Sequence, residues 1–195
     1  MKNNKKENIL IATKKVISTR GIQNASVREI SKAAGVTTGA IYHHYKSKED
    51  ILYDVMADSL AKSNEVLENV RLKNIETDKV LNQVIEGIRE RFNKEEENKI
   101  QFYLAMTGIE DNKGIRDRFK DQYKKWITNI EELLKVAYTR EDIKDINALA
   151  SFLLSAIDGF LLQYMLGANT CTPQEFTSMY EKILFKGIPS IVDNQ

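Results

Sequence analysis

The chain has 195 residues, of which 42% are hydrophobic and 29% charged, and a formal net charge of +1; this composition is typical of a globular protein with one large domain or two small ones. Its single cysteine, Cys171, excludes an internal disulfide, fits a reducing cytoplasm, and cannot complete a closed zinc site with two adjacent histidines, so we expect neither a metal nor a cofactor. Two prolines and nine glycines favour long helices over a many-turned β protein.

The first two predicted helices are marked by an apolar face and by capping residues. In residues 8–21, "NILIATKKVISTRG", apolar side chains recur at helical spacing, and Gly21 can end the helix in the left-handed conformation. The second helix, residues 27–34, begins at a capping box of Ser26 and Glu29 and stops at Gly35.

Two further capping signals follow closely. Thr37 can cap a third helix over residues 38–45, "TGAIYHHY". Ser47 can cap a fourth, long helix over residues 48–70, with Asp50 in the position that reaches back to the cap.

Beyond residue 75 the predicted helices are longer, and none of the sequence shows the alternation of a strand. Their expected ranges are 78–92, 98–108, 114–138, 140–166 and 173–187. Thr139 and Asp142 are expected to cap the fourth of these, whereas Thr172, Pro173 and Glu175 form a complete start signal for the last. The predicted fold is therefore all-α, with about nine helices in an N-terminal domain of three (residues 1–47) and a C-terminal helical domain (residues 48–195).

The segment "SVREISKAAGVTTGAIYHHY" has the sequence form of a helix-turn-helix. Gly35 supplies the positive φ of the tight turn, and Val36 fills the angle between the two helices. Charge supports a role in binding nucleic acid. Residues 1–50 hold ten Lys and Arg against four acidic residues, a net +6, while the remaining residues hold 19 against 24, a net −5.

The second helix of such a motif lies in the major groove of DNA, which suggests specific contacts. Gly39 permits close approach, while Thr37 and Thr38 can bond phosphates or base edges. Tyr42, His43 and His44 extend the outward face, and Lys48 adds a charge near phosphate. Ile41 and Tyr45, four residues apart, are expected to face inward.

Two other interpretations, in which the segment has no role in DNA binding, compete with this one. Many helical proteins have a glycine between helices, so "IYHHY" could be an ordinary amphipathic turn of a core, and the lysines could be a solvated tail. A helical adaptor with an accidental helix-turn-helix would look the same. The coincidence of turn, caps, charge excess and small polar residues in one segment favours DNA binding.

The stretches "ILIATKKVISTRGIQNASVREISKAAGV" and "TTGAIYHHYKSKEDIL" resemble the N-terminal domain of the tetracycline-repressor-like (TetR) family of bacterial transcription regulators. The resemblance covers about residues 6–55, and "SAIDGFLLQ" is similar to the family's penultimate, dimerising helix. It implies that Ser26, Arg28 and Lys48 also lie where relatives touch DNA. Many relatives have lysine where this chain has Thr38, so the operator sequence is not predicted.

The same resemblance implies a homodimer, a palindromic double-stranded DNA operator, and a small-molecule effector whose binding releases the DNA, as in a repressor. The helix over residues 140–166 is apolar nearly all round, so we expect it to be buried on several sides. With the last helix it could form a four-helix dimer interface; a purely intramolecular core is the alternative. The expected interface residues are Leu154, Ile157, Leu161, Phe176, Met179, Tyr180 and Ile183.

Aromatic and methionine side chains of the C-terminal domain suggest a pocket for a small, mostly apolar or cationic ligand. The candidates are Tyr103, Met106, Phe119, Tyr123, Trp126, Asp158 and Tyr164. Each type is more often found in a core than in a pocket. Asp158 is the most informative, because a carboxylate amid apolar residues needs a partner in the protein or in a cation.

An enzyme is the rival class, but the chain carries no catalytic motif of the GxSxG, P-loop, HExxH or glycine-rich nucleotide-binding kind, and we expect no catalytic residues. A dyad of Cys171 with a histidine would join two different domains. The stretch "ALASFLLSAIDGFLLQYMLGA" carries Asp158 and Gln163, so we interpret it as a buried helix and not a membrane span. A cytoplasmic regulator is the expected function.

Overall fold

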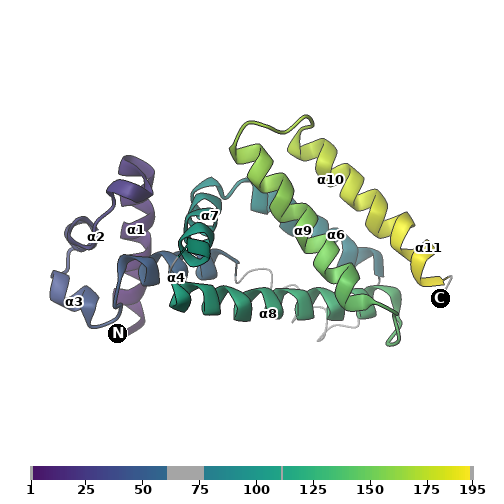
Figure 1. The fold of residues 1–195 in the computed structure, drawn as a ribbon, viewed down its shortest axis with the longest axis horizontal. Helices are drawn as coiled ribbons and strands as arrows, with labels where there is room; N and C mark the ends of the chain where they lie inside the picture. Colours follow the sequence, from purple (N-terminus) through teal and green to yellow (C-terminus); the bar gives the residue numbers. More distant parts are fainter. Residues whose placement is uncertain (1, 61–76, 111, 194–195) are drawn as a thin grey trace. The chain divides into compact units, whose positions relative to one another are not determined.

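The computed structural model describes residues 2–60, 77–110 and 112–193 (Figure 1). Every regular element in these ranges is a helix, which confirms the all-α prediction. The chain packs as two compact units, Met1–Leu60 with Glu95–Asp117, and Ala61–Lys94 with Arg118–Gln195. The first unit extends past residue 47. The expected division at that residue, between a DNA-binding domain and a ligand-sensing domain, therefore stays a prediction.

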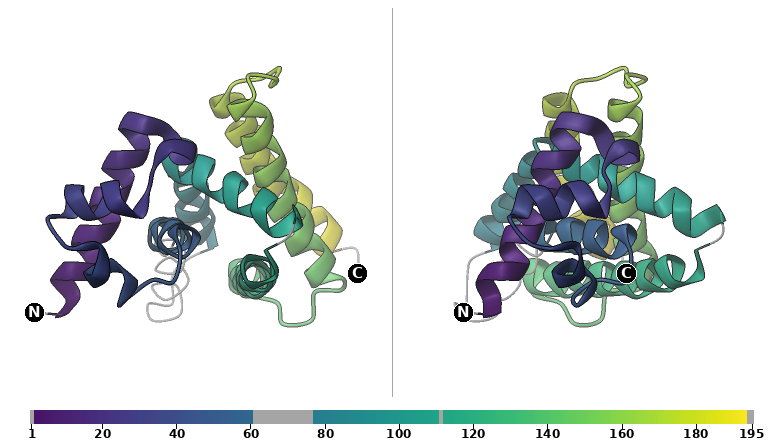
Figure 2. Two further views of the ribbon diagram at one scale, coloured as in Figure 1. Left: turned by 60° about the vertical axis from the view of Figure 1, so that its left-hand side comes forward. Right: turned by 90° about the vertical axis from the view of Figure 1, so that its left-hand side faces the viewer.

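The first unit is built around the N-terminal helix. Its elements are α1 (Lys2–Asn24), α2 (Val27–Ala34), α3 (Thr38–Tyr42), α4 (Lys48–Leu60) and α7 (Glu95–Glu110). Helix α1 packs against α2, α4 and α7, and α4 also packs along α7 (Figure 2). Their shared core consists of fully buried aliphatic side chains: Ile9, Ile17, Ile30, Ile41, Ile51, Leu52, Met56, Ile100 and Leu104.

Local capping chemistry sets most helix starts in this unit as predicted. The hydroxyls of Ser26 and Thr37 accept backbone N–H groups of Glu29 (3.3 Å) and Ala40 (3.2 Å). Ser47 and Asp50 form the reciprocal bonds of a capping box at the start of α4. The predicted box at Ser26 is only half formed, because the Glu29 carboxylate pairs with Arg20 on α1.

Three predicted helix ends in the first unit are wrong. Helix α3 stops at Tyr42, and the two histidines lie in the turn after it. Gly21 interrupts α1 with φ 75° and ψ 162°, outside the left-handed helical region, and helical turns resume to Asn24. Helix α7 continues past Gly108 to Glu110. Gly108 does not end the helix; it lies close to the backbone of the following helix, where a Cβ would be 3.3 Å from the Arg116 nitrogen.

The second unit contains α6 (Thr77–Phe92), most of α8 (Lys113–Tyr138), α9 (Ile146–Met165), α10 (Pro173–Lys182), the π-helical turn η1 (Ile183–Gly187) and α11 (Ile188–Asp193). Helices α9 and α10 run side by side (Figure 1). The stacked rings of Phe160 and Phe176, 4.2 Å apart, and Phe92 edge-on to both, join α9, α10 and α6.

Two helix boundaries of this unit also differ from the prediction. Helix α9 begins at Ile146 and Thr139 does not cap it, because Thr139 and Asp145 both adopt φ 53° and take the chain out of helical geometry between α8 and α9. The last helix does not end at Gly187: the π-helical turn carries it into α11, where a proline in the first turn, Pro189, removes no required N–H. The Tyr138 hydroxyl donates to the Leu184 carbonyl inside that turn (2.7 Å).

Helix α9 was expected to be buried on several sides, but in the single chain it is buried on one. Leu153, Phe160 and Leu161 face the core, whereas Phe152 and Leu162, and Leu166 just after the helix, are exposed. Of the helices in the described ranges, α9 alone is long and apolar enough to cross a membrane by length and composition, a property it shares with core helices of soluble proteins. The continuation of α4 expected over residues 61–70 lies outside the described residues.

Candidate nucleic-acid interface

The turn between α2 and α3 is held by backbone geometry. Gly35 adopts φ 66° and ψ 30°, a conformation that favours glycine. Its N–H donates to the Lys32 carbonyl (3.3 Å), and the Val36 N–H donates to the Ser31 carbonyl (3.0 Å). These bonds fix the angle between the two helices, and the helix-turn-helix predicted around Gly35 is present.

Helix α3 is anchored on one side and open on the other. Ile41 is fully buried and Tyr45 nearly so, which confirms that these two side chains face inward. Tyr42 is 56% exposed, and His43 and His44 are exposed beside it, with their rings edge to face at 5.1 Å. Gly39 and Thr37 are exposed at the start of the helix. Helix α3 and the residues that flank it therefore offer aromatic, imidazole and hydroxyl groups, and their role as DNA contacts stays a prediction.

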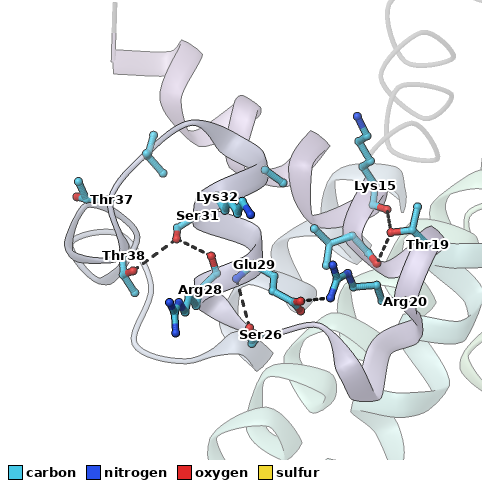
Figure 3. Close-up of a pocket in the computed structure, with 13 residues that line it drawn as sticks. Lys15, Thr19, Arg20, Ser26, Arg28, Glu29, Ser31, Lys32, Thr37 and Thr38 are labelled. Atoms are coloured by element: carbon cyan, nitrogen blue, oxygen red, sulfur yellow. Dashed lines mark hydrogen bonds and ion pairs between the residues drawn. The ribbon is translucent and has the colours of Figure 1, made fainter.

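A groove runs between α1, α2 and the start of α3 (Figure 3). Its polar wall consists of four cations (Lys15, Arg20, Arg28, Lys32), five hydroxyls (Thr19, Ser26, Ser31, Thr37, Thr38) and one carboxylate, Glu29. Arg20 pairs with Glu29, so the groove carries an excess of positive charge. Such a groove suits the phosphate backbone of DNA.

Sequence reasoning missed Lys15, Arg20 and Lys32 as members of this groove. They counted toward the N-terminal charge excess, but no spacing linked α1 to the motif. The packing of α1 against α2 brings them together. The ion pair of Arg20 with Glu29, nine residues apart, joins α1 to α2 and matches no spacing within one helix, so the sequence does not predict it.

Lys48 makes contacts within the first unit, and its expected place near a DNA phosphate stays a prediction. Its ammonium donates to the Ile22 carbonyl (3.1 Å) and lies 5.5 Å from the centre of the Tyr103 ring on α7. The Tyr103 hydroxyl in turn donates to Glu49 (3.5 Å), and burial, followed by the charge of Glu49, raises the pKa of Tyr103. Lys48 therefore ties the start of α4 to α1 and α7, and its remaining N–H groups are the ones that could meet a phosphate.

The predicted ligand-pocket residues divide between the two units. Tyr103 and the exposed Met106 belong to the first; the other five, Phe119, Tyr123, Trp126, Asp158 and Tyr164, belong to the second. Within the second unit the Tyr123 hydroxyl donates to the Asp158 carboxylate (2.7 Å). The Tyr123 ring lies 5.1 Å from Trp126 and 6.2 Å from Phe119. Asp158 thus has the protein partner that its apolar surroundings required.

Tyr164 does not join that group, since its nearest recorded aromatic rings are Phe92 and Phe160. Four of the seven residues, Phe119, Tyr123, Trp126 and Asp158, therefore form a connected set between α8 and α9. We call this set the α8–α9 cluster.

The predicted dimer residues also divide. Leu161 and Tyr180 are buried inside the second unit, where the Tyr180 hydroxyl donates to the Leu153 carbonyl (3.2 Å), so neither can reach a partner without repacking. Met179 is 56% exposed. The other four, Leu154, Ile157, Phe176 and Ile183, are half-buried.

Comparison with known proteins points to one family. Residues 9–55 match the family model described as bacterial regulatory proteins, tetR family. The chain is 28% identical to the HTH-type transcriptional repressor BepR of Brucella suis, over 83% of this chain and 81% of that protein. It is 41% identical to the HTH-type transcriptional regulator AcrR of Shigella flexneri over 30% of this chain and 26% of that protein.

Solved structures share the fold at low sequence identity. A regulator from Saccharomonospora viridis in complex with choline aligns with a TM-score of 0.71 and 19% identity, over 94% of this chain and 97% of that one. FadR of Thermus thermophilus, a TetR-family transcriptional repressor in complex with lauroyl-CoA, aligns with a TM-score of 0.68 and 19% identity, over 94% of each chain. These alignments support the two-part helical fold.

Proposed function

We propose, from the premise that this chain belongs to the tetR family of bacterial regulatory proteins, that it is a repressor whose dimer binds a palindromic operator and releases it when a small effector binds. The family confirms the resemblance drawn from the N-terminal motifs. It also makes the chain a DNA-binding transcription regulator and not an enzyme. A regulator of this kind acts where the DNA is, in the bacterial cytoplasm.

The observation that carries the proposal is the face shared by α3 and the basic groove. Tyr42 of α3 and its two flanking residues, Thr37 before the helix and His43 after it, are exposed, while Arg28 and Lys32 line the groove on α2. Hydroxyls and imidazoles can meet base edges, and the cations can meet the phosphates on either side. Hydrogen-bonding groups and cations thus lie on either side of one turn, whose backbone Gly35 holds with a positive φ. A surface without a binding function has no need of this combination.

Salt dependence tests this function. The DNA upstream of the chain's own gene should bind the purified protein with an affinity that falls steeply, about 10³- to 10⁵-fold between 50 and 200 mM salt for roughly six to ten phosphate contacts. Fluorescence anisotropy of the labelled fragment measures it. An affinity that is flat over this range would contradict binding through the basic groove.

A second copy of the chain is the partner we propose for the exposed face of α9. Phe152 and Leu162 of that helix and Leu166 just after it are exposed, and Phe152 is 63% exposed. Gly159 lies among them with open space where its Cβ would be, so another helix can approach closely. Met179 of α10 is the one residue of the expected interface that is strongly exposed. The proposed interface therefore replaces Leu161 and Tyr180 by these exposed side chains.

We propose the α8–α9 cluster as part of the effector site. A carboxylate beside aromatic faces suits an organic cation, and the half-buried Trp126 and Tyr123 suit an apolar group. Choline and lauroyl-CoA, found in the two similar structures, are therefore rational first probes of the two effector classes. By linkage, operator DNA must weaken effector binding by the factor by which the effector weakens DNA binding, typically about 5- to 150-fold.

Trp126 provides a test, because it is the one tryptophan of the chain. We expect an effector that raises Tm to change Trp126 fluorescence, and Trp126→Ala to retain DNA binding while its release by that effector is impaired. Thermal shift and anisotropy on the same samples measure both. The conservative Trp126→Phe serves as the control and should respond more strongly than Trp126→Ala. A Trp126→Ala chain that loses DNA binding and dimerisation together would place Trp126 in the structural core and remove it from the effector site.

A further inference from the structure

The start of α2 differs from the capping boxes of α4 and α10. In those two boxes the carboxylate accepts the backbone N–H of the cap residue, at 3.2 and 2.8 Å. At α2 the Ser26 hydroxyl accepts the Glu29 N–H, but among the bonds of residues 2–60 the return bond from the Ser26 N–H to the Glu29 carboxylate is absent. That carboxylate pairs instead with the Arg20 guanidinium of α1.

The ion pair of Arg20 and Glu29 lies in the basic groove (Figure 3). Arg20 reaches the groove from α1 and Glu29 from α2, and their side chains are 61% and 28% exposed. An exposed pair of this kind favours the paired arrangement by only about 1.4- to 5-fold, because water screens the attraction and both side chains lose freedom. A competing anion can therefore separate the two side chains.

The phosphate backbone of DNA is such an anion. A guanidinium can bind a phosphate through two parallel N–H groups, whereas a carboxylate in the same groove is repelled by it. Glu29 has a second partner within reach of its helix position, because the Ser26 N–H lies three residues before it at the positive end of α2. When a phosphate takes Arg20, the bond to Ser26 offsets the one that Glu29 loses.

We propose that Arg20 exchanges Glu29 for a DNA phosphate when the chain binds DNA, and that Glu29 then completes the capping box at Ser26. Glu29 is thus a positioning residue that holds Arg20 in the free chain, and the exchange weakens binding by the free energy of the pair that must be broken. The proposal rests on the proposed binding of DNA through the basic groove and adds the change of partners that accompanies it.

Amide hydrogen exchange of the full-length chain without DNA tests the second partner of Glu29. Arg20→Gln removes the ion pair, so Glu29 should turn to the Ser26 N–H. The Ser26 amide should then exchange about 2- to 10-fold more slowly than in the wild-type chain, as for one net hydrogen bond. The Ser47 amide, already bonded to Asp50, is the internal control and should not change. Ser26 exchange at the wild-type rate would overturn the proposal.

The salt dependence of binding to the labelled upstream DNA tests the phosphate contact. Arg20→Gln should flatten the slope of log affinity against log salt by about 0.9 per chain, and Arg20→Lys should restore it. Glu29→Gln should raise the affinity by about 1.4- to 5-fold per chain at an unchanged slope, because no pair has to be broken and glutamine also completes the box. Arg89→Gln, which removes an exposed arginine paired with Glu86 on α6, is the matched control and should leave slope and affinity unchanged.

Two results would overturn the inference while leaving DNA binding intact. A wild-type slope for Arg20→Gln, or a steeper slope for Glu29→Gln, would show that the pair stays closed on DNA. The double variant Arg20→Gln/Glu29→Gln leaves no carboxylate without a partner; it should have the slope of Arg20→Gln, and a wild-type slope would contradict the proposal even if Arg20→Gln alone lowers Tm. A wild-type affinity that does not vary with salt is a different outcome, because it would reject the basic groove as a DNA site and this proposal with it.

Discussion

Replacing Tyr42 and His43 by alanine together is expected to abolish operator binding while the chain stays folded. Both side chains are exposed at the end of α3, so their removal uncovers no core. Each is expected to contribute about 1–3 kcal/mol to DNA binding if it contacts a base or its phosphate. His44→Ala should weaken binding less, because we expect His44 to meet the DNA backbone and not a base. Gel shift beside circular dichroism, on the same samples, gives both readouts.

Controls separate loss of contact from loss of structure. Tyr42→Phe keeps the ring and should retain part of the affinity. Ile109→Ala removes a side chain of similar exposure from α7, outside the helix-turn-helix, and should bind DNA like the wild-type chain. If Tyr42→Ala and His43→Ala instead lower helicity or Tm, with the DNA defect following from unfolding, these two residues belong to the support of the motif and not to its DNA contacts.

Charging the exposed face of α9 is expected to separate the dimer and, with it, to remove operator binding. A chain carrying Phe152→Glu and Leu162→Glu would bury two unpaired carboxylates in the proposed interface, which is strongly unfavourable. Each monomer then presents one recognition helix, and the gain from binding two linked half-sites, of order 10²- to 10⁴-fold, disappears. Light scattering after size exclusion should give about the 22.4 kDa of one chain in place of twice that mass.

Gly159→Leu is a second route to the same result, because the open space at Gly159 admits a side chain in the single chain but not against a partner helix. Ile11→Glu, at a residue 60% exposed on α1, is the matched control and should remain dimeric. A Phe152→Glu/Leu162→Glu chain that is still dimeric, with unchanged affinity for the operator, would show that the second copy docks elsewhere.

Helix starts could be predicted because their chemistry is local. Ser26, Thr37, Ser47 and Thr172 each bond a backbone N–H three residues ahead, and such spacing is legible in the sequence. The positive φ of Gly35 was legible for the same reason. Thr139 failed as a cap because it takes a positive φ, which its neighbours in sequence do not signal.

The features that could not be predicted from the sequence depend on contacts between residues far apart in the chain. An apolar helix such as α9 carries no mark of which side faces its own core, so Leu161 was expected at the dimer interface and is instead fully buried. The bond of Lys48 to the Ile22 carbonyl spans 26 residues and had no signal in the sequence, while the charge it was expected to add near phosphate stays a prediction. The Tyr123–Asp158 bond joins α8 to α9 over 35 residues; the need for a partner was predictable from the apolar surroundings of Asp158, but its identity was not.

Sequencing of the DNA that the wild-type full-length chain enriches from a randomised library tests the central claim most directly. The dimeric regulator predicts an inverted repeat whose half-sites lie about one helical turn apart, roughly 34–36 Å or somewhat more between recognition helices. The repeat should vanish from the DNA selected by the Tyr42→Ala/His43→Ala chain. Enrichment of no sequence over random DNA, or of the same repeat by that double variant, would contradict the claim that α3 reads an operator.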